Sequence, residues 1–508
     1  MHNSSDLFEL IKSLSGSEKR YFKLFASLQK GDKNYLKLFD AIAEQKEYDE
    51  KEIKKKFAKE KFARQLTRIK NYLYGIVLKC LEQYDNGIDS ELKKLSRQIE
   101  VLYRKRLYKQ CLKIIARAKK IGYKHEHFPF LLEITEWETK IISQDPYGGK
   151  FKQSLQEILK EKRNIIELVR NNNDYHELSA QSLKILHIQG VSRNEDSIAA
   201  FNHLLDNALL KDESKAMTFK SKMFFYEVLA LCARGKGDST NGYIYRDKIV
   251  QLTEMNPEKG PGYNYIIALF NLLIGQLEVK KYRQFTSTIQ KLKNMFKNEL
   301  NTLSEDTQAL LFKSIYPLEL NMYMQTQQFE KAISIIPQFK DGLRRYEEKM
   351  RTMDKIGCYY DFTCLYFYCG DYKEALVWSN KMLNYPHLEF RQDLLCFARI
   401  INLMLHFELQ NFDLLEYIVK STYRFLHKRG GLYKFETCVL NFIRKKFPKI
   451  NDNKELLEAF KELKTELEKI TRDPFEKLAL EYFDFISWID SKIQNRQLTD
   501  VVTLRSAE

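Results

Sequence analysis

The sequence predicts an all-α protein, and three observations lead to that prediction. Glycine and proline are scarce among the 508 residues, 19 and 9 respectively, although strand-rich proteins need both for their many turns. Apolar residues recur at helical spacing, as in Leu456, Phe460, Leu463 and Leu467, with lysine and glutamate opposite. No stretch shows the alternation of apolar and polar residues that a half-buried strand requires. With 44% hydrophobic and 30% charged residues, the chain has the balance of a folded globular protein.

Cysteine usage and hydropathy suggest the compartment. The eight cysteines are dispersed and none has C-x-x-C spacing, which argues against a zinc ribbon or a redox dithiol and is typical of a reducing environment. Residues 1–14 lack the basic start and apolar run of a secretory signal. The most apolar stretch, residues 263–279, is interrupted by Asn264, Asn271 and Gln276, so it fits a buried helix better than a membrane span. We therefore expect a soluble cytoplasmic protein without a transmembrane segment.

The first 85 residues predict a separate helical module. Four or five short helices are expected, in the segments 14–25, 35–42, 53–62 and 65–81. Ser17 is the expected N-cap of the first, with Arg20 in place of the acid of a full capping box. The module has no repeat signature. It is expected to be either a polar cap on a solenoid or a recognition module of its own.

Positive charge is concentrated in the first quarter of the chain. The formal net charge is +16, and residues 1–122 hold 29 basic and 16 acidic side chains, so thirteen of the sixteen net charges lie there. Between residues 93 and 120, eleven basic residues stand against the single acid Glu100. Four of them recur every four positions from Lys105 to Arg117, which predicts a basic stripe along one helix. The candidate residues for an anionic partner are Lys93, Lys94, Arg97, Arg104, Lys105, Arg106, Lys109, Lys113, Arg117 and Lys120.

The chain also contains a weak sequence repeat. An aromatic residue is followed by an apolar or small residue three positions later, and usually by another after seven, which places the side chains on one helix face. Such sets begin at Tyr108, Tyr282, Phe329, Tyr372 and Phe412. The last four are separated by 47, 43 and 40 residues, and the gap before Tyr282 leaves room for three more repeats.

The clearest unit spans residues 359–386, with the turn G-D-Y-x-x-A at residues 370–375, and resembles a tetratricopeptide repeat. Gly370 allows a tight turn, Tyr366 and Tyr372 are expected to fill the space between the two helices, and Ala375 lets them approach closely. Met382 departs from the small residue usual in the family. The opening Leu-Ser-x-Ser-Glu-Lys-Arg, residues 14–20, is similar to that of uncharacterised bacterial proteins of this type. The resemblance implies about seven or eight hairpins stacked in an α-α superhelix over residues 86–496, with a period longer than the usual repeat of about 34 residues.

At the C-terminal end, residues 454–470 predict an amphipathic helix, and Asp473-Pro474 predicts the start of the next one. The periodic pattern stops near Gln497. Residues 497–508 are therefore expected to form a flexible tail.

No motif indicates catalysis. The sequence lacks G-x-x-x-x-G-K-[ST], H-E-x-x-H and G-x-S-x-G. The run His125-Glu126-His127 would need metal ligands from elsewhere, because side chains two positions apart do not share a helix face. We expect no catalytic residue, no cofactor and no metal site.

Three interpretations of the basic stripe remain open: a solvated surface paired with acids from elsewhere in the fold, a site for an acidic protein or an anionic membrane face, and a site for a phosphate backbone. The sequence predicts a non-enzymatic scaffold or adaptor that binds a protein or peptide through a solenoid surface. The alternative is a regulatory protein whose basic N-terminal quarter contacts nucleic acid.

Overall fold

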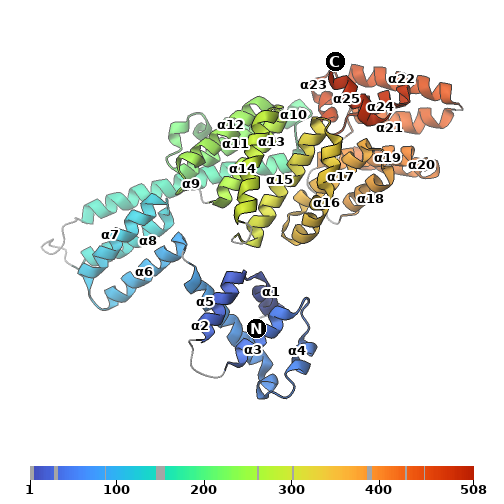
Figure 1. The fold of residues 1–508 in the computed structure, drawn as a ribbon. Coiled ribbons are helices and arrows are strands. Elements are labelled where there is room, and N and C mark those ends of the chain that lie inside the picture. Colours follow the sequence, from blue (N-terminus) through green and yellow to red (C-terminus); the bar gives the residue numbers. More distant parts are fainter. Residues whose placement is uncertain are drawn as a thin grey trace. The chain divides into compact units, whose positions relative to one another are not determined.

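The computed structural model describes residues 5–27, 33–85, 87–144, 155–259, 262–299, 303–385, 392–428, 432–450 and 452–507. The fold is all-α, as predicted, and no strand occurs within these ranges (Figure 1). The chain divides into an N-terminal unit, residues 1–166, and a C-terminal unit, residues 167–508. Each unit is described below by itself.

The N-terminal unit begins with a helical module around its own apolar core. Its helices are α1 (Asp6–Ser13), α2 (Gly16–Ser27), α3 (Asn34–Glu44), α4 (Glu50–Lys56), the 3-10 turn η1 (Lys61–Gln65) and α5 (Leu66–Tyr84). The core contains Phe22 and Phe39, whose ring centroids lie 4.4 Å apart. Helices are confirmed in the expected segments 14–25, 35–42 and 65–81. The helix expected over 53–62 is wrong in its second half, because α4 ends at Lys56 and residues 57–60 form a turn. The cap of α2 is Ser15 and not Ser17. The Ser15 hydroxyl accepts from the Glu18 amide at 3.2 Å while the Ser15 amide donates to the Glu18 carboxylate at 2.7 Å, which is a full capping box.

Three further helices complete this unit around a second apolar cluster. They are α6 (Ile88–Arg104), α7 (Tyr108–Lys124) and α8 (Phe128–Ile142), followed by the start of α9 (Leu155–Gln189). Helix α6 packs on α7 and α7 packs on α8, around Ile99, Cys111 and Ile115. The boundary expected near residue 85 falls between the two apolar clusters and stays a prediction.

The C-terminal unit consists largely of consecutive helical hairpins, in the α-α superhelical manner predicted. After α9 and α10 (Glu195–Leu205), the successive pairs are α11 (Phe219–Gly235) with α12 (Ser239–Met255), α13 (Gly262–Glu278) with α14 (Tyr282–Glu299), α15 (Glu305–Gln325) with α16 (Phe329–Tyr346), α17 (Thr352–Tyr368) with α18 (Tyr372–Leu383), and α19 (Gln392–Glu408) with α20 (Phe412–Lys428). Helices α21 (Lys434–Asn441), α22 (Asn453–Ile470), α23 (Pro474–Lys477), α24 (Phe485–Gln494) and α25 (Leu498–Ala507) follow. Each hairpin packs on the next, and the buried apolar residues form two clusters, one drawn from residues 175–322 and the other from residues 309–498.

The same turn joins the two helices of every one of these five hairpins. One residue takes a left-handed conformation, with a positive φ, and the next amide donates back to a carbonyl five residues earlier. At Gly370, with φ of 77°, the Asp371 amide reaches the Tyr366 carbonyl at 2.9 Å. Glycine fills this position twice in these hairpins; the other left-handed residues are Lys280, Gln327 and Gln410. The turns between α6 and α7 and between α7 and α8 repeat it with Arg106 and Glu126.

The inward faces of the second helices follow the predicted three- and seven-residue offsets. The side chains at these offsets are buried in all five predicted sets, and they are Cys111, Ile115, Phe285, Ile289, Ala332, Ile336, Ala375, Ser379, Leu415 and Val419. The spacing left room for three further repeats before Tyr282, and the described residues of that interval do not form three regular ones. That interval holds α8, the 35-residue α9, α10 and the hairpin α11–α12, in which Ser239, Gly242 and Arg246 occupy the repeat positions.

The tetratricopeptide-like unit is a hairpin, but its ring packing differs from the expectation. Ala375 is fully buried, as predicted. The ring against Tyr372 is that of Phe367, at 5.3 Å, while the ring of Tyr366 lies 5.1 Å from the Lys340 ammonium on α16. Tyr366 therefore joins neighbouring hairpins. Pro386, the last residue of the match, lies outside the described residues.

The end of the chain is not the flexible tail that was expected. Residues 498–507 form α25, which packs on α24 and buries Leu498 and Val501. Two buried apolar residues three positions apart are too few to indicate a helix from the sequence. The packing on α24, which stabilises α25, is a tertiary contact that the sequence does not show.

Candidate interaction surface on α6 and α7

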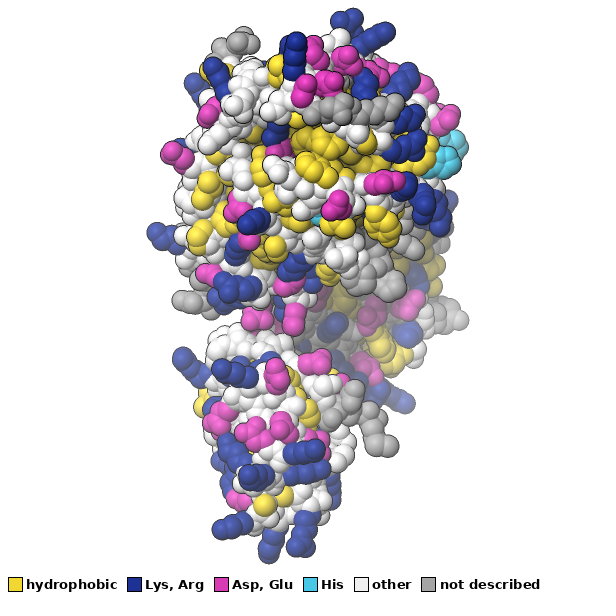
Figure 2. Space-filling view, turned by 90° about the vertical axis from the view of Figure 1, so that its right-hand side faces the viewer, with side chains coloured by type: hydrophobic (Ala, Val, Ile, Leu, Met, Phe, Trp, Pro, Cys, Tyr) yellow, Lys and Arg dark blue, Asp and Glu magenta, His cyan; other side chains and the backbone are white. Residues whose placement is uncertain are grey.

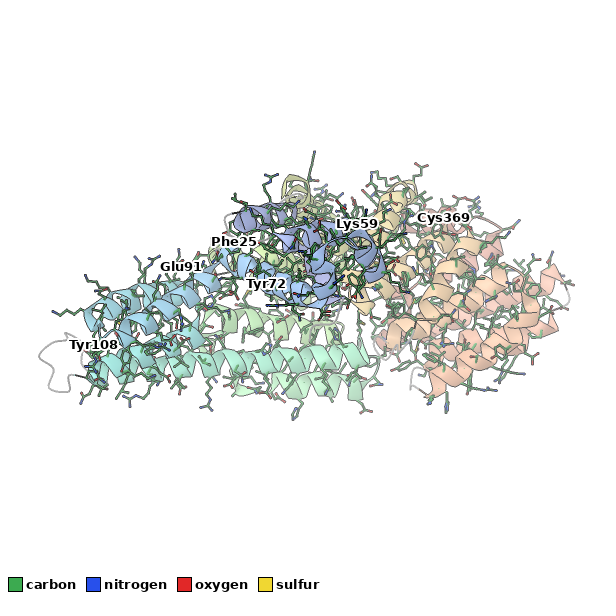
Figure 3. The ribbon with its side chains drawn as sticks, turned by 90° about the horizontal axis from the view of Figure 1, so that it is seen from below. Phe25, Lys59, Tyr72, Glu91, Tyr108 and Cys369 are labelled. Atoms are coloured by element: carbon green, nitrogen blue, oxygen red, sulfur yellow. The ribbon has the colours of Figure 1, made fainter. Side chains whose placement is uncertain are left out.

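All ten basic candidate residues are exposed on the α6–α7 hairpin. Lys93, Lys94, Arg97 and Arg104 lie on α6, Lys105 and Arg106 form the turn, and Lys109, Lys113, Arg117 and Lys120 lie on α7. Figure 3 labels Glu91, near the start of α6, and Tyr108, the first residue of α7, at opposite ends of this hairpin.

The predicted stripe is confirmed for α7 and wrong for its first member. Lys105 is the C-cap of α6, and Arg106 beside it has a φ of 58°, so α7 starts only at Tyr108. The exposed basic side chains of α7 form a line, here called the α7 row: Lys109, Lys113, Arg117, Lys120 and Lys124. The row is opposite the buried Cys111, Ile115 and Ala118, and it extends over about 22 Å at 1.5 Å per helical residue. Sequence reasoning missed Lys124, although it follows Lys120 by four positions.

Three of the ten side chains are paired within the hairpin. Glu100 binds both Arg97 and Arg104, three and four positions away on α6, and these partners lower the pKa of its carboxyl group, Arg97 foremost. Arg117 reaches back to Glu91 at 2.7 Å. For these residues the interpretation as a solvated, paired surface is adequate. Lys94 donates to the Asp85 carbonyl at 3.3 Å, and no carboxylate among the described residues forms an ion pair with it.

The remaining cations have no carboxylate partner. Within the described ranges, no ion pair involves Lys93, Lys105, Arg106, Lys109, Lys113, Lys120 or Lys124. Lys109 and Lys113 are one turn apart, as are Lys120 and Lys124, so like charges face each other at close range. Such an arrangement is unfavourable in the isolated chain and favours a counter-charge from outside.

Lys119 belongs to the interior and not to this surface. Its ammonium is bound by Glu138 of α8 and lies 2.6 Å from Glu161 of α9, which also accepts from the Tyr123 hydroxyl at 2.8 Å. Burial raises the pKa of the Glu138 carboxyl group. These contacts hold α7 against both following helices, so the α7 row is presented by a fixed element.

Apolar side chains are exposed beside the cations. Val101 on α6, Leu107 in the turn and Tyr123 on α7 have about two fifths of their surface exposed, at 41%, 39% and 40%. A charged surface interrupted by aliphatic and aromatic groups is typical of protein interfaces, whose affinity comes mainly from a few apolar anchors.

The run His125-Glu126-His127, considered above as a source of metal ligands, forms the turn between α7 and α8. Glu126 is buried with a φ of 55° in the α7–α8 turn, and Nδ1 of His127 lies 3.3 Å from the Asp89 carboxylate. In the part of the chain that the structure describes, no three His, Cys, Asp or Glu side chains are grouped as a metal site would require. Seven cysteines are buried, and burial raises the pKa of Cys232 and Cys438 to about 12.

None of the described helices has the length and the apolar character needed to cross a membrane. No model of a known protein family matches the chain, and no curated protein is significantly similar to it.

Proposed function

We propose that this chain is a non-enzymatic scaffold of the tetratricopeptide-like kind that binds an acidic protein segment along the α7 row. The supporting observation is the row itself: five exposed cations on one helix face, four of them without an ion pair among the described residues. The exposed Val101, Leu107 and Tyr123 beside it would receive apolar side chains of the same segment.

The dimensions favour an acidic helix as the bound segment. A row of about 22 Å matches about fifteen helical residues, so acids repeating every three to four positions would meet successive lysines. Complementary charge of this kind accelerates association and selects the partner, while the apolar neighbours supply most of the affinity.

The test compares two charge-reversed proteins in affinity capture followed by mass spectrometry. The first carries Lys109→Glu, Lys113→Glu and Lys120→Glu. The matched control carries Lys184→Glu, Lys373→Glu and Lys469→Glu, which are exposed helical lysines outside the row and likewise have no ion pair within the described ranges. We expect acidic proteins that the wild type and the control retain and that the α7-row protein loses by tenfold or more. Identical capture by all three proteins contradicts the proposal.

The alternative partner for the same residues is nucleic acid. It predicts retardation of DNA or RNA with steep salt dependence, abolished by Lys105→Glu, Lys109→Glu and Lys113→Glu. The apolar side chains beside the row favour the protein partner, because a phosphate backbone offers no apolar group that could pack against them. Nuclease treatment before capture separates the two cases.

A further inference from the structure

A second cationic surface lies on the N-terminal module, at the end where α4 and η1 meet α5. Between residues 51 and 70 the sequence holds nine basic residues and two acids, Glu52 and Glu60. Figure 2 shows Lys and Arg side chains gathered at the lower end of this module. We name this surface the α4–α5 patch and define it by its exposed cations: Lys51, Lys55, Lys59, Lys61, Arg64 and Arg68.

The acids around the patch are already neutralised by other lysines. Glu60 pairs with Lys37 at 2.7 Å, Glu44 pairs with Lys56 at 2.9 Å, and Glu50 pairs with Lys54 and Lys70. In the segments that the structure describes, no ion pair involves any of the six patch residues. Glu52 is the single acid of residues 51–70 without a cation, and it accepts from the Gln45 amide at 3.0 Å. The patch therefore has six cations without an ion pair among the described residues, against the carboxylates of Glu52 and of Asp49, which accepts the backbone amides of Lys51 and Glu52 at the start of α4.

The backbone beneath the patch is fixed. The buried ammonium of Lys70 on α5 lies 2.6 Å from Glu50 and 3.1 Å from the Tyr48 hydroxyl. Hydrogen bonds from Lys54 and from Lys70 lower the pKa of Glu50 to about 2. The rings of Phe57 and Phe62 meet at 5.0 Å and tie the end of α4 to η1. The cations consequently project from a folded scaffold, which reduces the entropy lost when they bind a ligand.

The patch differs from the α7 row because it has no exposed aliphatic side chains to act as anchors. The large hydrophobic residues Ile53, Phe57, Phe62 and Leu66 are buried, and none between residues 51 and 71 is exposed. A protein interface would need such anchors at its centre, and an amphipathic membrane helix would need an exposed apolar face. A phosphodiester backbone needs neither, because its affinity comes from releasing counterions when cations neutralise phosphates.

One aromatic side chain stands at the border of the patch. Tyr72 on α5 is 56% exposed and follows Arg68 by one helical turn, and its ring meets the edge of Tyr35 at 5.7 Å. Figure 3 labels Tyr72 and Lys59 on this module. A supported, exposed ring next to cations is what an unpaired base requires for stacking. We infer that the α4–α5 patch binds the sugar-phosphate backbone of nucleic acid, with Tyr72 stacking on a base of single-stranded segments.

The test is the retardation of a labelled duplex and of a labelled single strand by the full chain. With six cations engaged, the logarithm of the binding constant for duplex should fall against the logarithm of salt concentration with a slope of about −5. The patch variant carries Lys55→Glu, Lys59→Glu, Arg64→Glu and Arg68→Glu, and we expect it to lose retardation of both probes. Tyr72→Ala should weaken single-strand binding by tenfold or more and leave duplex binding unchanged.

Two controls keep the outcome decisive. The first, with Lys160→Glu, Lys184→Glu, Lys373→Glu and Lys469→Glu, has the same net charge as the patch variant and should bind both probes like the wild type. The second control carries Lys109→Glu, Lys113→Glu, Lys120→Glu and Lys124→Glu and should also retain binding of both probes. A failure of the nucleic-acid inference therefore leaves the function proposed for the α7 row untouched. Circular dichroism confirms that each variant is folded.

Three results would overturn the inference. The first is no retardation by the wild type at low salt. The second is equal loss in the patch variant and in the first control. The third is patch-dependent sedimentation with vesicles of phosphatidylcholine and phosphatidylserine without any retardation of nucleic acid, which would assign the cations to a lipid surface.

Discussion

The two units place their cations differently, although both contain buried ion pairs, such as that of Lys70 with Glu50 in the N-terminal unit. In the N-terminal unit most lysines and arginines are on the surface, and two groups of them, the α7 row and the α4–α5 patch, have more cations than nearby acids can pair. In the C-terminal unit two arginines, Arg193 and Arg246, are buried and bound to carboxylates far along the chain. Net charge alone does not reveal this difference, because pairing decides whether a cation holds the fold together or remains free for a partner.

Arg193 is the clearest case of a charge in the interior. It follows α9, and its guanidinium binds Glu436 of α21, lies 3.3 Å from Glu476 of α23 and stacks 4.1 Å from the Tyr433 ring. Glu476 also accepts the backbone amides of Lys434 and Phe435, both at 3.0 Å, at the start of α21. Segments more than 240 residues apart in the sequence thus share one buried site.

Removing this cation should produce the largest loss of stability. Arg193→Ala leaves two buried carboxylates without their counter-charge, and we expect a loss of about 3–5 kcal/mol in the free energy of unfolding. Arg170→Ala is the matched control, because Arg170 is an exposed arginine of α9 that lies 3.9 Å from Asp174, and it should cost less than about 0.5 kcal/mol. Urea denaturation measures both. Similar small losses for the two variants would mean that the buried site adds nothing to stability.

A half-buried carboxyl group should make the C-terminal unit sensitive to pH. Burial raises the pKa of Asp361 on α17 to about 7, despite a hydrogen bond with Asn321. Between pH ~4 and pH 7 the folded chain therefore keeps a proton that the unfolded chain releases, so stability falls as pH rises through this window. Asp361→Asn should remove up to about 4 kcal/mol of that loss.

The measurement is the difference in unfolding free energy between Asp361→Asn and the wild type at pH 5 and at pH 8. Other groups that titrate in the same range cancel in this difference. We expect the variant to gain on the wild type as pH rises. A difference that is the same at both pH values would show that Asp361 is ionised in the folded chain.

Two helical glycines should respond to alanine with opposite signs. A Cβ on Gly342 in α16 would lie 2.1 Å from the Phe312 ring, so Gly342→Ala should destabilise by about 1–3 kcal/mol. Gly75 in α5 is exposed, with nothing within 4 Å of the added carbon, so Gly75→Ala should stabilise by about 0.5–1 kcal/mol. Thermal unfolding of both variants checks the pair, and a stabilising Gly342→Ala would contradict the close packing of α16 against Phe312.

The sequence predicted helices and their inward faces well, and it failed where a tertiary contact made the decision. The offsets from Tyr282 and Phe412 located buried residues because helical periodicity is local. Turns with Lys280, Gln327 or Gln410 in the left-handed position were not predictable, because only Gly237 and Gly370 indicate such a turn by their residue type.

Arg246 in the hairpin α11–α12 and Lys105 at the start of the predicted stripe are two further places where the sequence alone was not enough. Arg246 occupies a position where the repeat has an apolar residue, and its charge is tolerated because Glu278, 32 residues later, lies 2.5 Å away. Lys105 was assigned to the stripe because no glycine marks the end of α6. The cations of the candidate site could be predicted from spacing alone, and so could the pairs of Glu100 with Arg97 and Arg104 on the same helix. The pair of Arg117 with Glu91 depends on how α7 packs on α6, which follows from the fold.

The smallest expected effects concern the α7 row itself. Arg117→Ala breaks an exposed ion pair with Glu91 and should cost at most about 0.5 kcal/mol. Lys113→Ala should instead stabilise by about 0.2–0.5 kcal/mol, because it relieves repulsion from Lys109 and Arg117 one turn away on either side. Hydrogen exchange of the α7 amides in the full chain measures both changes locally. A clear loss of protection in Lys113→Ala would show that the row stabilises the hairpin. A gain in protection combined with loss of the captured acidic partner would show that the chain tolerates local repulsion on α7 for the sake of binding.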